Sequence, residues 1–172
     1  TSTCRHIIKD FLWPLVEPGL TLGEALARFR GVRGHGMAKA TVENALLDLA
    51  AKREGVPLYR HLGLERRKVM SGVSLGIQES PAALVEAAAE AIASGYHRIK
   101  MKIKRGKDLE YAGELRRRFP ELRLMVDANG DYSLSDAAHL ARLDELDLMM
   151  IEQPLSYSDI YQHSKLQREL KT

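Results

Sequence analysis

The chain has 172 residues, enough for a domain with a real hydrophobic core, and its formal net charge of +3 is a mild basic excess. Its single cysteine, Cys4, excludes an intrachain disulfide and a cysteine metal cluster, which fits a reducing cytoplasm. No apolar run approaches the roughly 20 residues of a membrane span, so no membrane partner is expected. Three consecutive arginines, Arg116 to Arg118, are interpreted as a solvated helix face rather than a nucleic-acid site, because no aromatic pattern accompanies them.

Helical patterns fill the first 68 residues. Three main helices are expected, at residues 5–13, 21–30 and 37–54. Pro14 is expected to stop the first of them, and Thr21 with Glu24 has the spacing of a capping box for the second. Gly55 is expected to end the third helix. The boundary of this region is placed near Lys68, after a short charged linker.

From residue 69 onward, strand-like apolar runs alternate with helical patterns. The expected strands lie at residues 69–76, 98–104, 122–129 and 148–155, and the helices between them at 81–94, 108–119 and 134–146. This order is typical of βαβ units with a parallel sheet, and its near-constant period favours an α/β fold of the TIM-type (β/α) barrel. Four βα units are present, whereas a whole barrel needs about 250 residues, so the sequence is expected to be a fragment of a longer protein.

The strand at residues 98–104 has lysines at alternate positions. Lys100 and Lys102 therefore leave one face of the strand, and Ile99, Met101 and Ile103 leave the other. Taken alone, the pattern also fits an exposed sheet face or a charged edge strand that resists aggregation.

Polar residues recur where the predicted strands end. Asp127 follows Lys102 by 25 residues, and Glu152 follows Asp127 by the same interval. Ser74 and Asn129 also fall at or just after strand ends, where (β/α) barrels carry their chemistry. Carboxylate oxygens suit a hard cation such as Mg²⁺, so this edge of the sheet is a candidate metal site. The structural alternative is an ordinary barrel with buried Lys–Asp and Lys–Glu pairs.

Two lysines packed beside a metal ion should have lowered pKa values, because desolvation and like charge both disfavour the ammonium form. A neutral lysine is a base that can remove a carbon-bound proton. A divalent ion on the substrate carboxylate would hold the resulting enediolate. The lysine pair and the carboxylate pair together therefore favour proton abstraction over a purely structural role.

Three short motifs carry a resemblance to a known family. They are K-x-K at Lys100–Lys102, D-x-N at Asp127–Asn129 and E-Q-P at Glu152–Pro154. In this order and spacing the sequence resembles the muconate-lactonizing subgroup of the enolase superfamily, from about Arg33 to its end. A finer match, carried by GVSLGI, RIKMKIKRG and IEQPL, is to o-succinylbenzoate synthases and N-acylamino acid racemases.

The resemblance implies a role for each of these residues. Lys102 would be the acid/base at the substrate α-carbon, and Lys100 would stabilise the enolate and keep the pKa of Lys102 low. Asp127 and Glu152 would bind Mg²⁺, or Mn²⁺ in its place. Asn129 would lie beside the metal, and Ser74 would contact the acyl tail of the substrate.

The resemblance also implies domains and an activity. Residues 1–68 would be the helical, C-terminal part of a capping domain, and residues 69–172 the first half of the barrel. The parent enzyme would be a lyase or isomerase that abstracts the proton α to a carboxylate of a small molecule. It would be an o-succinylbenzoate synthase in menaquinone biosynthesis, an N-acylamino acid racemase, or both, and a homo-oligomer. A dipeptide epimerase and a muconate cycloisomerase are related alternatives.

The sequence departs from the family in two ways. The third acidic ligand and the second lysine, which the family carries on later strands, lie outside these 172 residues. The fragment by itself is therefore expected to be inactive and to bind Mg²⁺ poorly. A non-catalytic truncated remnant is the alternative from another functional class.

Overall fold

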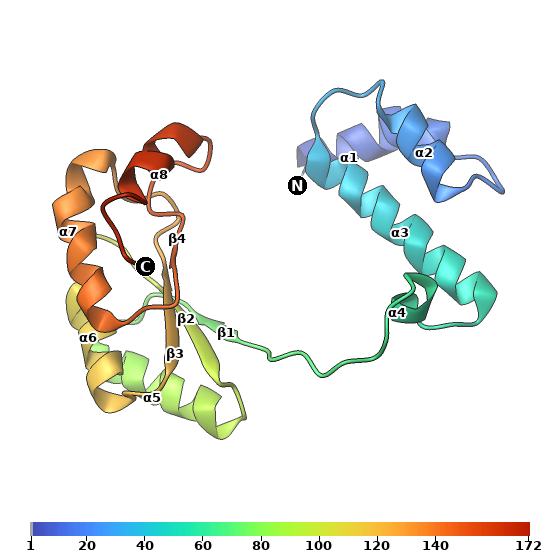
Figure 1. The fold of residues 1–172 in the computed structure, drawn as a ribbon. Coiled ribbons are helices and arrows are strands. Elements are labelled where there is room, and N and C mark those ends of the chain that lie inside the picture. Colours follow the sequence, from blue (N-terminus) through green and yellow to red (C-terminus); the bar gives the residue numbers. More distant parts are fainter. Residues whose placement is uncertain (1) are drawn as a thin grey trace. The chain divides into compact units, whose positions relative to one another are not determined.

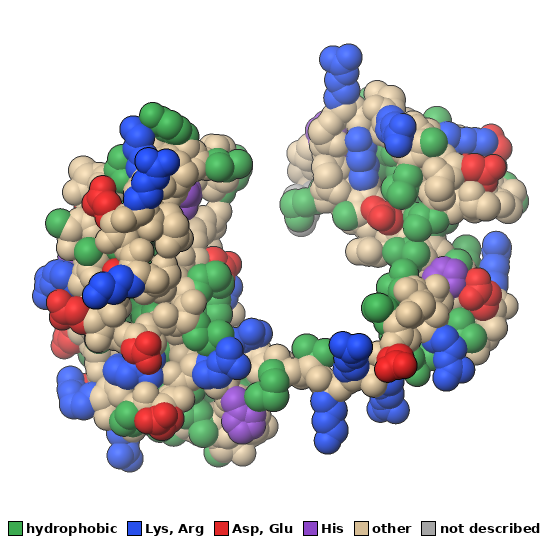
Figure 2. Space-filling model, viewed as in Figure 1, with side chains coloured by type: hydrophobic (Ala, Val, Ile, Leu, Met, Phe, Trp, Pro, Cys, Tyr) green, Lys and Arg blue, Asp and Glu red, His purple; other side chains and the backbone are tan. Residues whose placement is uncertain are grey.

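The computed structural model describes residues 2–172, and the chain divides into two compact units (Figure 1). The first unit ends at Lys68, and the second comprises Val69–Thr172. Within the described residues, no helix has both the length and the apolarity needed to cross a membrane. On the face of the second unit shown in Figure 2, acidic and basic side chains are interspersed.

The first unit is helical. Its elements are α1 (Ser2–Ile7), a π-helical turn η1 (Ile8–Leu12), a 3₁₀ turn η2 (Trp13–Leu15), α2 (Leu22–Phe29), α3 (Gly36–Glu54) and α4 (Leu58–His61). Its core is built by Leu12, Phe29 and Val42, which are at most 5% exposed. Each such side chain removed from water stabilises the unit by about 1.5–3 kcal/mol.

The helix ends of this unit follow mostly from local sequence. The capping box is present: Glu24 N–H donates to Thr21 Oγ1 over 3.3 Å, and Thr21 N–H donates to Glu24 Oε2 over 2.9 Å. Gly55 ends α3 with a left-handed φ of 68°. The prediction that Pro14 stops the first helix was wrong, because Pro14 lies in the first turn of η2, where a missing N–H breaks no helical bond.

The second unit alternates strands and helices. Its elements are β1 (Val73–Leu75), α5 (Pro81–Ala93), β2 (Arg98–Lys102), α6 (Leu109–Arg118), β3 (Arg123–Asp127), η3 (Leu134–Asp136), α7 (Ala137–Ala141), η4 (Arg142–Leu146), β4 (Ile151–Glu152) and α8 (Ile160–Leu166). The four strands are all parallel and lie in the order β1-β2-β3-β4. Parallel strands in sequence order, each followed by a helix, confirm the α/β prediction of four barrel-type units.

The two faces of this sheet differ. Ile99, Met101 and Val126 have no exposed surface and pack in the main core. Helices α5, α6 and α7 cover this face (Figure 1). Lys100 and Lys102 leave from the other face, as their alternation along β2 requires.

Elements of the second unit differ from the sequence prediction, most clearly β1, β4 and the helix before β4. The last strand was predicted at residues 148–155 but covers only Ile151–Glu152. The first strand covers only Val73–Leu75, because Val69 and Met70, which were expected to extend it, are 85% and 60% exposed and gain no packing. The predicted helix at residues 134–146 is a short α-helix between two 3₁₀ turns. Asp136 bonds back to Ser133 N–H over 2.8 Å and tightens the first of these turns.

Candidate active site

The strand register brings the candidate residues into rows. Lys102 is the register partner of Asp127, and Asp127 is the partner of Glu152. Lys100 is the partner of Ser74. Because register partners in a parallel sheet project from the same face, all of these side chains belong to the face opposite the helices.

Asp127 is the centre of a bonded network. Its Oδ2 lies 3.1 Å from Lys100 Nζ and 3.2 Å from Lys102 Nζ. Lys100 Nζ also donates to Glu152 Oε2 over 3.0 Å, and Lys102 Nζ donates to Asn129 Oδ1. The structure therefore brings five of the six candidate residues into one network.

Asn129 is held by its backbone as well as by its side chain. Its N–H donates to Asp127 Oδ1 over 3.0 Å. Its φ of 46° is left-handed, a conformation that asparagine tolerates better than most residues. This turn directs the amide of Asn129 back to Lys102.

Ser74, the sixth candidate, lies beside the network. Its side chain is exposed, and within the described residues no hydrogen bond joins its hydroxyl to the lysines or carboxylates. With Lys100, Met125 and Met150 it lines a recess of about 340 Å³ on the open face. Arg98 also lines this recess, so it combines two cationic side chains and one hydroxyl with the apolar surface of the two methionines. Such a lining suits a ligand group that is partly apolar and partly anionic.

The carboxylate of Asp127 is only 3% exposed, and its charge depends on its partners. Burial raises the pKa of Asp127, but hydrogen bonds from Lys100, Asn129 N–H and Lys102 outweigh burial and hold the pKa below its ordinary value. Asp127 is thus ionised at neutral pH.

The lowered pKa values expected for lysines beside a metal ion stay a prediction. In the chain by itself, the pKa of Lys100 moves in the opposite direction. Hydrogen bonds to Glu152 and then to Asp127 raise the pKa of Lys100, against a smaller opposing effect of desolvation. The like charge of Lys102 does not dominate, because two carboxylates contact the Lys100 ammonium directly.

The donor set fits part of a site for a hard cation. Carboxylates of Asp127 and Glu152 converge on one point, since an oxygen of each lies within 3.1 Å of Lys100 Nζ. Oxygen donors from two carboxylates are the ligands that Mg²⁺ prefers. Across residues 2–172 no group of three or more histidine, cysteine, aspartate or glutamate side chains is placed to hold a metal ion. The chain therefore offers two acidic ligands, and further donors would have to complete the six that Mg²⁺ takes.

Family comparisons agree with this arrangement. Residues 83–172 match the model described as enolase C-terminal domain-like, and residues 11–63 match the N-terminal domain of mandelate racemase and muconate lactonizing enzyme. The chain belongs to the enolase superfamily. This confirms the resemblance drawn from the K-x-K, D-x-N and E-Q-P motifs.

Two curated relatives match this superfamily member over nearly its whole length. An o-succinylbenzoate synthase from Geobacillus kaustophilus is 46% identical, with 99% of this chain and 46% of that protein covered. An N-succinylamino acid racemase from Thermus thermophilus is 52% identical, with 98% of this chain and 46% of that protein covered. The chain thus spans about half the length of these relatives.

Solved structures share the fold. An enolase superfamily member from Listeria innocua is 38% identical, with a TM-score of 0.92 over 99% of this chain and 47% of that one. An enolase from Bradyrhizobium, solved with magnesium and mandelic acid, has a TM-score of 0.88 at 24% identity over 99% of this chain and 50% of its own. That protein shares the fold of this chain.

A second polar group, which the sequence analysis missed, is formed by the β2–α6 loop, the β3–α7 loop and α7. It consists of Asp108, Tyr132 and His139, which are joined through the Asp108 carboxylate. Asp108 was assigned to a predicted helix, whereas it is the N-cap of α6. The sequence does place an aspartate directly before a helical pattern, which is typical of an N-cap. That pattern does not reveal that Asp108 bonds to residues 24 and 31 positions further along the chain.

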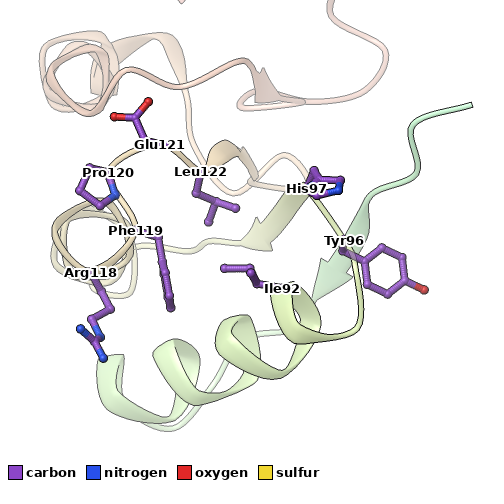
Figure 3. A pocket seen from close by; sticks show the side chains of 8 residues that line it. All are labelled: Ile92, Tyr96, His97, Arg118, Phe119, Pro120, Glu121 and Leu122. Atoms are coloured by element: carbon purple, nitrogen blue, oxygen red, sulfur yellow. The ribbon is translucent and has the colours of Figure 1, made fainter.

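A separate cavity of about 360 Å³ lies at the other end of the strands (Figure 3). Its lining includes Tyr96 and His97, directly before β2, and Leu122, directly before β3. In Figure 3, Ile92 and Phe119 face the hollow from α5 and from the end of α6. In barrel enzymes this end of the strands contributes to stability rather than to chemistry.

Proposed function

We propose that the protein carrying this chain is a Mg²⁺-dependent enzyme that removes the proton α to a carboxylate. Its activity would be that of an o-succinylbenzoate synthase, an N-acylamino acid racemase, or both. The observation that carries this proposal is the lysine pair on one strand face, with Lys100 and Lys102 sharing the buried acceptor Asp127. Relatives of both names at 46% and 52% identity support it.

Each residue of the network has a role in this proposal. Lys102 exchanges the α-proton, because hydrogen bonds to Asp127 and Asn129 fix the position of its Nζ. Lys100 presents an ammonium to the developing enolate oxygen. Asp127 and Glu152 would hold Mg²⁺ or Mn²⁺, and the ion would supply positive charge that stabilises negative charge on the substrate carboxylate.

The remaining contacts concern the substrate. Ser74 faces the acyl group of a small carboxylate from the recess it shares with Met125 and Met150. Asn129 orients Lys102 and would lie beside the metal ion. The first unit would be the helical part of a capping domain, the second unit the first half of the barrel, and the enzyme a homo-oligomer.

The test is solvent deuterium exchange at the α-carbon of an N-succinyl amino acid, using the natural full-length protein with Mg²⁺. Wild type should exchange the proton, and Lys102→Ala should lower the rate by about 10³-fold, within the range for removal of a general base. Lys104→Ala, an exposed lysine two residues on, is the matched control and should exchange normally. Absence of exchange in wild type, or exchange unaffected by Lys102→Ala, would refute the racemase version, and absence of dehydration as well would refute the whole proposal. Dehydration of the cyclohexadiene precursor is assayed separately for the synthase activity.

A non-catalytic remnant is distinguished by metal addition. A complete site binds Mg²⁺ only in the folded state, so the thermal midpoint should rise by several degrees at a Mg²⁺ concentration about 100 times Kd. Glu152→Gln should remove most of that shift. A thermal midpoint of the wild-type protein that does not change on addition of Mg²⁺ would favour the non-catalytic remnant.

A further inference from the structure

A buried carboxylate in the loop after β2 is bonded by side chains from two other segments. Asp108 is 5% exposed, and its Oδ2 accepts from Tyr132 Oη over 2.6 Å and lies 2.7 Å from His139 Nε2. Its Oδ1 accepts from Leu109 N–H over 2.7 Å. One carboxylate therefore joins the β2–α6 loop, the β3–α7 loop and α7.

The β3–α7 loop that Tyr132 anchors is also the loop that contacts the catalytic candidates. It begins with Asn129, whose Oδ1 accepts from Lys102 Nζ. Further along, Gly130 N–H donates to Gln153 O over 2.8 Å, and Tyr132 N–H donates to Pro154 O over 3.1 Å. The path of this short loop thus sets both the amide that holds Lys102 and the turn that follows Glu152.

The burial of Asp108 exceeds what helix capping needs. An N-cap aspartate works at the surface, where its charge stays hydrated, and burying a carboxylate is costly unless it is fully bonded. Burial raises the pKa of Asp108, but hydrogen bonds from Tyr132, His139 and Leu109 N–H outweigh it and hold the pKa low. The carboxylate is therefore charged and saturated with donors, which makes it a rigid anchor for Tyr132.

We propose that Asp108 and Tyr132 are positioning residues for Lys102, acting through the Asn129 loop. The inference rests on the proposed function, in which Lys102 exchanges the α-proton. A displacement of a base by about 1 Å can slow a reaction by about 10²-fold, so a hydroxyl that fixes this loop has a measurable effect on turnover. Arg105 makes a second, exposed contact with the same loop, because its backbone N–H donates to Asp131 Oδ2 over 2.9 Å.

The chain offers a matched pair of variants. Tyr132→Phe and Tyr111→Phe each remove one hydroxyl from a tyrosine that is 5% or 6% exposed. Tyr111 Oη donates to Glu79 O over 3.0 Å and so fixes the loop after β1, away from Asn129. A general loss of packing should affect both variants alike.

The measurements are kcat and KM for α-proton exchange in the full-length protein, and amide hydrogen exchange of residues 129–133. Tyr132→Phe should lower kcat by about ten-fold with KM within about two-fold, because the base and not the binding surface is displaced. Its 129–133 amides should exchange about ten-fold faster. Tyr111→Phe should show neither change. Asp108→Asn keeps the size of the side chain and a capping oxygen. It should change kcat and amide exchange in the same direction as Tyr132→Phe, but by less.

The outcomes separate the two proposals. If wild type exchanges the proton but both Phe variants lose kcat equally, positioning through Asn129 is wrong and the proposed function stands. If wild type neither exchanges the α-proton nor dehydrates the cyclohexadiene precursor, the proposed function is wrong. Unchanged amide exchange at residues 129–133 in Tyr132→Phe would overturn the anchoring. Faster amide exchange confined to Tyr132→Phe and Asp108→Asn supports the anchoring whether or not turnover is seen.

Discussion

The carboxyl and amino ends of the strands satisfy their charged side chains in different ways. At the carboxyl ends, Lys100, Lys102 and Asp127 bond to one another. At the amino ends, Arg116 donates to backbone carbonyls of Leu146, Pro120, Leu122 and Asp147 over 2.6–2.9 Å. The expectation that Arg116 belongs to a solvated helix face was therefore wrong.

The difference separates fixed charges from exchangeable ones. A backbone carbonyl does not titrate and cannot move to another partner. Arg116 therefore links α6 permanently to the chain before β4. Carboxylates and ammonium groups can trade partners with a metal ion or a substrate. At the carboxyl ends, the lysine and carboxylate network can therefore exchange partners, whereas the bonds of Arg116 at the amino ends stay fixed.

The largest expected effect on stability is from Asp127→Asn. It leaves two ammonium groups without their shared anion and should lower the free energy of unfolding by about 3 kcal/mol, the low end for breaking a buried pair, since both lysines retain some contact with water. Glu152→Gln is the matched control and should cost under about 1 kcal/mol, because the Glu152 side chain is 38% exposed and bonds only Lys100. Urea unfolding measures both, and equal losses would contradict the central place of Asp127.

Arg116→Lys tests the other end of the strands. A lysine cannot reproduce the planar fork that reaches four carbonyls, so stability should fall by about 2 kcal/mol. Arg117→Lys, whose side chain is 72% exposed, should change stability by less than about 0.5 kcal/mol. Neither variant should alter kcat. A loss of kcat in Arg116→Lys without a loss of stability would contradict the purely structural role given to the amino ends of the strands.

Acid should weaken the Asp108 anchor. Its pKa is depressed in the folded state, so its stabilising effect is present above the unfolded pKa of about 3.9 and is lost as pH falls through the folded pKa. Wild type should exceed Asp108→Asn by about 1 kcal/mol at pH 7, the gain of charged over neutral hydrogen bonds, and the gap should close below about pH 4. Urea midpoints measured from pH 7 to pH 2.5 test this, and a gap independent of pH would refute it.

The smallest expected effect is from Thr21→Ala, which breaks a bond between near neighbours in sequence. Loss of the exposed capping box should destabilise the first unit by about 0.5 kcal/mol. Circular dichroism should show the loss, while α-proton exchange at saturating substrate should be unchanged. Thr41→Ala is a control in the same unit, because Thr41 lies inside α3 and bonds only Met37 O over 2.8 Å.

The sequence alone determined the features that depend on spacing along the chain. The capping box joins residues three apart, and the alternation along β2 places both lysines on one face whatever the partner strand. The 25-residue interval between strand ends then predicted that Asp127 and Glu152 lie near Lys102. The first two features follow from the 3.6- and 2-residue periods of helix and strand, and the interval follows from the near-constant length of the βα unit.

Only the tertiary structure decided which atoms meet. Lys100 and Lys102 share one oxygen of Asp127 because the register pairs Lys102 with Asp127. Hydrogen bonds to Glu152 and to Asp127 raise the pKa of Lys100 in the chain by itself. Tyr132 reaches Asp108 across 24 residues, and Arg116 reaches Leu146 across 30. Such contacts depend on loop paths and strand register, which are set by packing of the whole sheet and carry no fixed interval in the sequence.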